Sequence, residues 1–286
     1  MLGILDRIRC TWGLMGASWR VLLANKSLLV FPLFSGLASI VVIASFWYPL
    51  ARVFPNGMGA ENAPAASEAA RYAVVFAFYL CNYFVIIFFN SALVACAMVG
   101  MHGGKLTVGD GLRMAGSRLP AIFGWALVSA TVGLVLRIIE DRSETVGKIM
   151  SSLLGTAWTM VTFLAVPVLV VEKRGPFEAF KRSASLLKRT WGEQIAGHFA
   201  FGIVFFLLAL PAFVIVFSVL GLSGGAGGPL VIALFVALAI YILTLAMVQS
   251  ALHSIFRAAL YLYAINGEAP SGFGRSDLLR GAVGSR

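Results

Sequence analysis

Charged residues are scarce in this sequence. Asp, Glu, Lys and Arg make up 12% of its 286 residues, while 60% are hydrophobic and the mean hydropathy is +0.92. Charged residues alone account for about a quarter of a typical soluble domain. The composition therefore excludes an ordinary soluble protein and indicates a chain that lies largely within a lipid bilayer.

Cysteine and histidine are also scarce, with three residues each. No Cys or His pair has the spacing of metal ligands, so we expect no metal site and no other cofactor. Cys10, Cys81 and Cys96 lie outside the segments expected to face outward, so no disulfide framework is predicted. The first 26 residues lack the apolar core and cleavage site of a signal peptide, and the first span is expected to be an uncleaved anchor.

Catalytic groups are missing as well. Gly221-Leu-Ser223-Gly is similar to the Gly-x-Ser-Gly of intramembrane serine proteases. Ser223, however, is expected at the outer end of a span, whereas His102, His198 and His253 are expected at inner ends. A bilayer of roughly 30 Å would separate them, although a nucleophile and its base must lie within hydrogen-bond reach. We therefore predict a non-enzymatic protein.

Six apolar stretches are long enough to cross the hydrocarbon core, which takes roughly 20 helical residues. Backbone groups in lipid must be hydrogen-bonded within the segment, so the predicted fold class is an all-α polytopic membrane helix bundle. The last stretch continues without a breaker through Ala264, which predicts one long helix, while Pro167 and Pro211 are expected to kink two others. The spans are expected near residues 27–50, 72–99, 121–140, 147–171, 196–220 and 229–251.

Basic charge falls on alternate connections between these spans. The segments before residue 27, near 100–120, near 172–195 and after 251 hold 17 of the 22 Lys and Arg and 7 of the 12 acids, a net charge of +10. The other connections are neutral. Because cytoplasmic loops of membrane proteins carry the Lys/Arg excess, both termini are predicted to be cytoplasmic. This pattern accounts for a pI of about 10 without a nucleic-acid partner.

Three basic amphipathic segments, near residues 4–23, 107–119 and 176–191, precede pairs of spans on this side. Thr107 and Asp110 have the spacing of a capping box. Such helices lie in the membrane interface with basic residues toward anionic headgroups; the alternative is that they only anchor the bundle. The expected anionic-lipid contacts are Arg7, Arg9, Arg20, Lys181, Arg182, Lys188 and Arg189. Residues 1–266 are interpreted as one transmembrane domain and 267–286 as a flexible cytoplasmic tail.

Polar residues recur at every fourth position of the last helix and so share one side of it. Intramembrane polar residues face the bundle interior or a water-filled cavity. Glu172, at the inner end of the fourth span, is a candidate partner for Arg257. Two interpretations stay open: hydrogen bonding between helices, and a substrate or proton pathway. The candidate polar face comprises Gln249, His253, Arg257, Tyr261, Glu172 and His198.

The stretch Val166-Pro167-Val-Leu-Val-Val-Glu172-Lys-Arg-Gly175-Pro176 is the most distinctive in the chain, together with Phe31-Pro32 and Arg257-Ala-Ala-Leu-Tyr-Leu-Tyr263. It resembles a motif of bacterial six-span membrane proteins of unknown function. These are loosely similar to the membrane domain that accompanies some glycerophosphodiester phosphodiesterases. The motifs direct topology, so the resemblance implies the architecture and no phosphodiesterase activity.

Together these features predict a non-enzymatic protein of the bacterial inner membrane that interacts with lipids or assembles with a partner through its basic cytoplasmic face. The expected partners are anionic membrane lipids and a membrane or cytoplasmic protein, or a second copy of the chain. The alternative is a transporter or channel that uses the polar face of the last helix. The lack of an acidic residue at mid-membrane counts against an ion-coupled carrier.

Overall fold

The computed structural model describes residues 16–53, 68–104, 106–141, 145–222 and 228–266, and their regular structure is entirely helical. The predicted all-α class is confirmed. Arg7, Arg9, Ser223 and the segment 267–286 lie outside the described residues. The elements are a helix over residues 16–24, the 3-10 helix η1 (Lys26–Leu29), and α2 (Val30–Val53), α3 (Glu68–Met101), α4 (Val108–Gly116), α5 (Leu119–Asp141), α6 (Val146–Val161), α7 (Ala165–Val171), α8 (Pro176–Leu222) and α9 (Pro229–Asn266).

Several of these helices are long and apolar enough to cross a membrane, as in a multi-pass membrane protein. In the described part of the fifth predicted span, the apolar segment Gly202–Val216 is shorter than the others. A total of six spans therefore stays a prediction, as does the side on which the termini lie. The five candidate spans are Lys26–Val53, Ala69–Met101, Leu119–Asp141, Val146–Val171 and Val231–Asn266.

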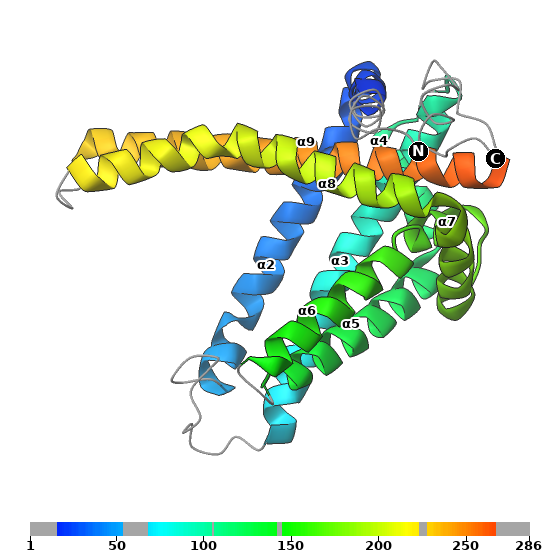
Figure 1. Ribbon diagram of the computed structural model, residues 1–286, viewed down its shortest axis with the longest axis horizontal. Coiled ribbons are helices and arrows are strands. Elements are labelled where there is room, and N and C mark those ends of the chain that lie inside the picture. The colour runs from blue at the N-terminus through cyan, green and yellow to red at the C-terminus, as the bar shows by residue number, and fades with distance from the viewer. Residues whose placement is uncertain (1–15, 54–67, 105, 142–144, 223–227, 267–286) are drawn as a thin grey trace.

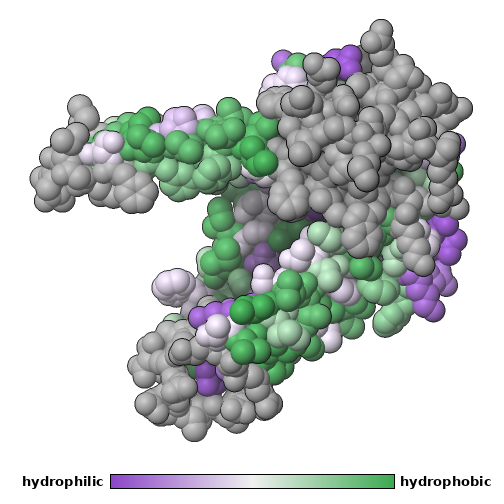
Figure 2. All heavy atoms as spheres, in the orientation of Figure 1, coloured by the Kyte–Doolittle hydropathy of each residue, from purple (hydrophilic) through white to green (hydrophobic). Residues whose placement is uncertain are grey.

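The helices form a bundle with an arm across one end. α2, α3, α5 and α6 run side by side, and α3 is central because it contacts α2, α4, α5, α7 and α9 (Figure 1). α8 and α9 pair as a hairpin that crosses the end of this bundle and projects beyond it (Figure 1). The projecting part, which we call the arm, has a largely hydrophobic surface (Figure 2).

The core lies where the second half of α9 enters the bundle. Ile255, Phe256, Leu260 and Tyr261 are all at most 1% exposed. By contrast, the most apolar stretch of the same helix, within the arm, has no residue buried inside the molecule. The second half of α9 is therefore packed inside the protein, whereas its first half, in the arm, is suited to an apolar medium.

The fourth predicted span is broken between α6 and α7. No proline lies at the break itself, since Pro167 falls in the first turn of α7, where a missing amide hydrogen is tolerated. Ser183 of α8 completes the break, because its hydroxyl donates to the Val161 carbonyl at 2.6 Å and accepts from the Leu164 amide at 3.2 Å. Backbone groups freed by the turn are thereby satisfied inside an apolar region.

α8 differs from the prediction of a separate interfacial helix at 176–191 followed by a span at 196–220. The structure joins the two in one helix of 47 residues. No proline interrupts the sequence between Pro176 and Pro211, and a single glycine such as Gly192 does not end a helix. Near Pro211, the Tyr241 hydroxyl of α9 donates to the Leu208 carbonyl at 2.7 Å and ties the two helices of the arm together.

α4 begins with the capping box expected from the sequence. The Thr107 hydroxyl accepts from the Asp110 amide at 3.2 Å, and the Asp110 carboxylate accepts from the Thr107 amide at 3.0 Å. The Thr107 hydroxyl also donates to the Asp110 carboxylate at 2.6 Å, and this bond, together with the one from the Thr107 amide, lowers the pKa of Asp110. Gly111 lets α4 approach α3 closely, because a Cβ there would collide with the Cys96 sulfur and the Phe31 ring.

Replacing Thr107 with alanine should loosen the start of α4. Loss of such a cap costs about 1 kcal/mol, so the amides of the first turn should exchange about fivefold faster with deuterated water. Because the pKa of Asp110 is lowered on folding, its contribution is complete above the ordinary carboxylate range and disappears as the pH falls through the lowered pKa. Thr131→Ala, which removes only a bond to the Leu127 carbonyl, is the control. Equal exchange changes at α4 in both variants would contradict the cap.

Candidate functional site

Glu172 lies where α7 ends and the chain turns into α8. Lys173 follows with a φ of 56°, a left-handed conformation that is uncommon outside glycine, and Pro176 takes the first position of α8. This turn leads α8 back over the end of α7, where the two helices pack together. The Glu172 carboxylate therefore lies beneath α8, and its side chain is only 14% exposed.

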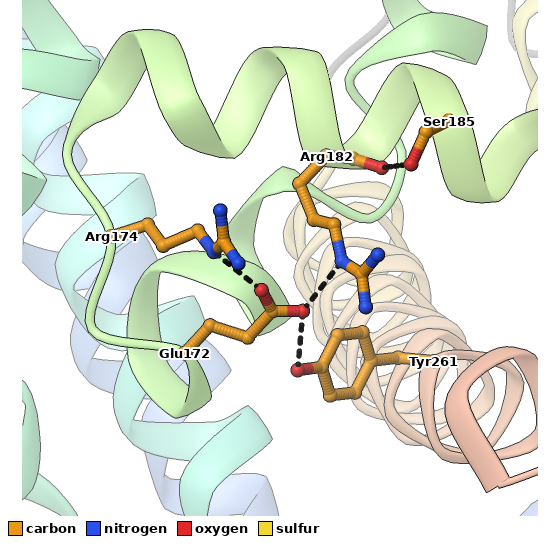
Figure 3. A network of polar contacts seen from close by, with 5 residues as sticks. All are labelled: Glu172, Arg174, Arg182, Ser185 and Tyr261. Atoms are coloured by element: carbon orange, nitrogen blue, oxygen red, sulfur yellow. Dashed lines mark hydrogen bonds and ion pairs between the residues drawn. The ribbon is translucent and has the colours of Figure 1, made fainter.

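Three side chains from two elements and the turn converge on this carboxylate (Figure 3). Arg174 Nε lies 2.6 Å from Oε2, and Arg182 Nε of α8 lies 2.9 Å from Oε1. The Tyr261 hydroxyl of α9 donates to Oε1 at 3.3 Å. The network therefore joins α7, α8 and the buried end of α9 through one acidic residue.

The α7–α8 corner, defined here as residues 172–182, carries a surplus of positive charge. Lys173 and Lys181 are exposed, and the two arginines are partly exposed, at 45% for Arg174 and 36% for Arg182. The ion pairs recorded for both arginines in the described chain use Nε. Terminal Nη groups suit planar bidentate recognition of an oxyanion.

The polar face predicted on α9 divides into two parts. Tyr261 joins the Glu172 network, whereas His253 and Arg257 both contact Phe163, the residue at the break between α6 and α7. Gln249 is half-buried one turn before His253. Among the described residues, Glu172 forms ion pairs with Arg174 and Arg182 rather than with Arg257. The side chain of His198 lies outside the described part.

Phe163 is the aromatic surface on which this face packs. The His253 ring meets it edge-on with centroids 5.5 Å apart, and the Arg257 guanidinium carbon lies 4.9 Å from its centroid. A guanidinium over an aromatic face gains a cation–π attraction that grows in a water-poor environment. The buried Arg257 Nε has no hydrogen-bond partner in the described structure. Hydrogen bonding between helices and a substrate or proton pathway both stay predictions for the polar residues of α9.

A stack of three aromatic side chains packs the start of α8, which is part of the corner, against the bundle. Trp125 of α5, Trp158 of α6 and Phe180 of α8 stack in sequence with centroids 5.8 and 5.6 Å apart. Phe180 directly precedes Lys181 and Arg182. The stack therefore fixes the start of α8 against the bundle and sets where these two cations lie.

Of the other expected lipid contacts, the structure describes the side chains of only some. Arg20 is exposed on the helix over residues 16–24. The side chains of Lys188 and Arg189 lie outside the described part, although the backbone there belongs to α8. Arg182 is thus the member of that set that joins the Glu172 network, and the exposed Lys181 directly precedes it on α8.

Sequence reasoning missed three residues that shape this site. Ser183 could have been found, because it is a serine three residues after Phe180 on the buried side of an otherwise apolar helix stripe. Phe163 and Arg174 carry no comparable pattern, since their roles depend on the helix break and on the turn at Lys173.

Replacing Glu172 with glutamine should destabilise the fold. The amide keeps the shape but loses the charge that pairs with two arginines, and because both arginines are partly exposed we expect a cost of about 1–2 kcal/mol. Thermal unfolding in detergent micelles would show this as a lower midpoint. Glu178→Gln, an exposed position in the first turn of α8, is the matched control. Equal midpoints for the two variants would contradict a central role for Glu172.

Comparison with known proteins adds a family but no activity. No curated protein and no solved structure matches the chain. Residues 69–273, which include the α7–α8 corner and all of α9, match the model of a family of unknown function, DUF6159. The likeness to the membrane domain associated with glycerophosphodiester phosphodiesterases stays a prediction. The chain thus belongs to the family of unknown function DUF6159.

Proposed function

We propose that this chain is a non-enzymatic protein of the bacterial cytoplasmic membrane that binds anionic phospholipid headgroups at the α7–α8 corner. The observation that carries the proposal is the surplus of cations around one shared carboxylate. Lys173, Arg174, Lys181 and Arg182 lie within ten residues, whereas the nearest acids are Glu172 and the exposed Glu178. Glu172 is already engaged by two of these cations.

The position of the corner supports a headgroup as its ligand. α7 is apolar and buried from Ala165 to Val170, and the basic residues begin immediately after Glu172. Cations at the end of an apolar membrane helix lie at the level of the headgroups. An anionic surface attracts each Lys or Arg near it by about 1 kcal/mol.

The chemistry of the corner also suits a phosphate. The arginine Nη groups offer paired donors, and the two lysines offer mobile point charges that need no fixed geometry. Anchoring alone would be served by cations spread along the helices. Assembly with a protein partner through the same basic face is the second part of the proposal, and a bound lipid is the simpler ligand to test.

Removing the two lysines should weaken anionic-lipid binding while leaving the Glu172 network intact. For Lys173→Ala combined with Lys181→Ala, a loss of about 1 kcal/mol per cation predicts roughly tenfold or greater weakening for phosphatidylglycerol. Native mass spectrometry of the protein titrated with phosphatidylglycerol or phosphatidylcholine measures this directly. Phosphatidylcholine binding should not change.

The control for this experiment lies at the opposite end of the bundle. Arg52 near the end of α2 and Lys148 in the first turn of α6 are both exposed. Arg52→Ala combined with Lys148→Ala removes the same charge without touching the corner. If both double variants lose phosphatidylglycerol equally, net charge rather than the corner governs binding and the proposal fails.

Orientation gives a separate prediction. The charge asymmetry supports a cytoplasmic corner and an outward start of α6. In a background with Cys10, Cys81 and Cys96 replaced by alanine, Lys148→Cys should react with a membrane-impermeant maleimide in intact cells. Ser117→Cys, an exposed position after α4, should react only after permeabilisation. The reverse labelling pattern would place the corner outside.

A further inference from the structure

A pocket of about 270 Å³, partly open to its surroundings, lies between α2, α3 and α9. Figure 1 shows where α9 passes α2 and α3 at the root of the arm. The walls of the pocket come from the first turns of α2, the inner half of α3 and the middle of α9. Ser250 of the pocket and Tyr261 of the α7–α8 corner are eleven residues apart on α9, about 16 Å along the helix. The pocket is therefore a site separate from the corner.

Four neutral polar side chains line this pocket among apolar ones: Ser35 and Ser39 of α2, Asn90 of α3 and Ser250 of α9. Asn90 Oδ1 accepts from the Ser254 hydroxyl at 3.1 Å, one turn beyond Ser250. That bond uses the amide oxygen and leaves the two amide hydrogens of Asn90 as donors. Polar groups from three helices thus converge on one space.

The pocket serines differ from several other hydroxyl residues of the apolar helices, although the buried Ser91 of α3 also lacks a partner among the described residues. Ser45, Thr131 and Thr244 each donate at 2.8 Å to the carbonyl four residues earlier, the usual arrangement in an apolar helix. For Ser35, Ser39 and Ser250, no hydrogen bond is recorded within the described residues. Their hydroxyls are therefore available to a ligand.

The lining excludes a charged ligand. No Asp, Glu, Lys, Arg or His is among the described residues that line the pocket. A charge held in an apolar site needs an opposite charge beside it. Phe31, Phe89 and Leu243 provide apolar walls instead. The combination of hydroxyl and amide donors with apolar walls suits an uncharged head that accepts hydrogen bonds.

We propose that this pocket binds the uncharged, oxygen-bearing head of a neutral membrane lipid, with its apolar tail leaving through the open side into the bilayer. The volume lies just below the range of about 300–1,000 Å³ that encloses whole drug-sized ligands, and so it fits the head alone. A diacylglycerol and an isoprenoid quinone share this chemistry, and the test below distinguishes them. The proposal does not depend on anionic-lipid binding at the corner.

The experiment measures thermal unfolding of the full chain in micelles with three short-chain probes: dioctanoylglycerol, a short-chain quinone and dioctanoylphosphatidylglycerol. A ligand of the folded state raises the midpoint by about 5–10 °C at a hundred times its Kd. At least one neutral probe should produce this shift, and the neutral probe that binds identifies the class of lipid. If neither does, the proposal is overturned.

Gly36 permits a variant that fills the pocket without disturbing its walls. It lines the pocket, and a Cβ built on it meets nothing within 4 Å. Gly36→Leu should abolish the shift from the neutral probe. Gly202→Leu is the matched control, since Gly202 is an exposed glycine of α8 outside the pocket whose added Cβ also meets nothing within 4 Å. Both replacements raise helix propensity, so neither threatens folding.

The serines test recognition separately from shape. Ser35→Ala combined with Ser39→Ala nearly keeps the volume and should weaken binding of the neutral probe about thirtyfold, since each of the two hydrogen bonds contributes about 1 kcal/mol. A shift that persists unchanged in Gly36→Leu places the neutral probe elsewhere and overturns the proposal. A shift from phosphatidylglycerol that is lost in the Lys173 and Lys181 double variant, but kept in Gly36→Leu, reports on the corner alone.

Discussion

The two hydrogen bonds of Ser183 stabilise the break between α6 and α7, and the rest of the site depends on this break. They satisfy the Val161 carbonyl and the Leu164 amide, groups that would be costly to leave unpaired in a bilayer. Because of the break, Phe163 lies against α9, where it contacts His253 and Arg257. α7 can then end with Glu172 beneath α8. A single serine hydroxyl thus links the polar face of α9 to the basic corner.

Features that depend on local pattern could be predicted from the sequence. Apolar length predicted the candidate spans, the absence of a breaker through Ala264 predicted one long final helix, and Thr107 with Asp110 predicted the start of α4. Each rests on residues within one or two helical turns of one another. Tyr261 and Glu172 were also assigned to one candidate polar face, although the expected partner of Glu172 was Arg257 and not Tyr261.

Features that depend on how helices meet could not be predicted in this way. Pro167 is the visible helix breaker, yet the break lies before it, at residues with no distinctive local pattern. Arg257 was the expected partner of Glu172. The turn at Lys173 instead leads the chain so that Arg174 and Arg182 lie within ion-pair distance of the Glu172 carboxylate. The pocket serines looked like ordinary residues of an apolar helix, because only the crossing of three helices brings them together.

The described residues of the arm carry no feature that distinguishes the two sides of a membrane, so the predicted orientation depends on charge. Residues 231–248 of α9 contain only Tyr241 and Thr244 as polar side chains, and Tyr241 is bound to the Leu208 carbonyl. A helix without a polar face cannot rest at a bilayer surface as an amphipathic helix does, so an apolar medium must enclose it. The side chains of such a hairpin do not favour insertion from one side of a membrane over insertion from the other. The predicted orientation rests instead on the basic corner and on the neutral connections expected at the opposite end.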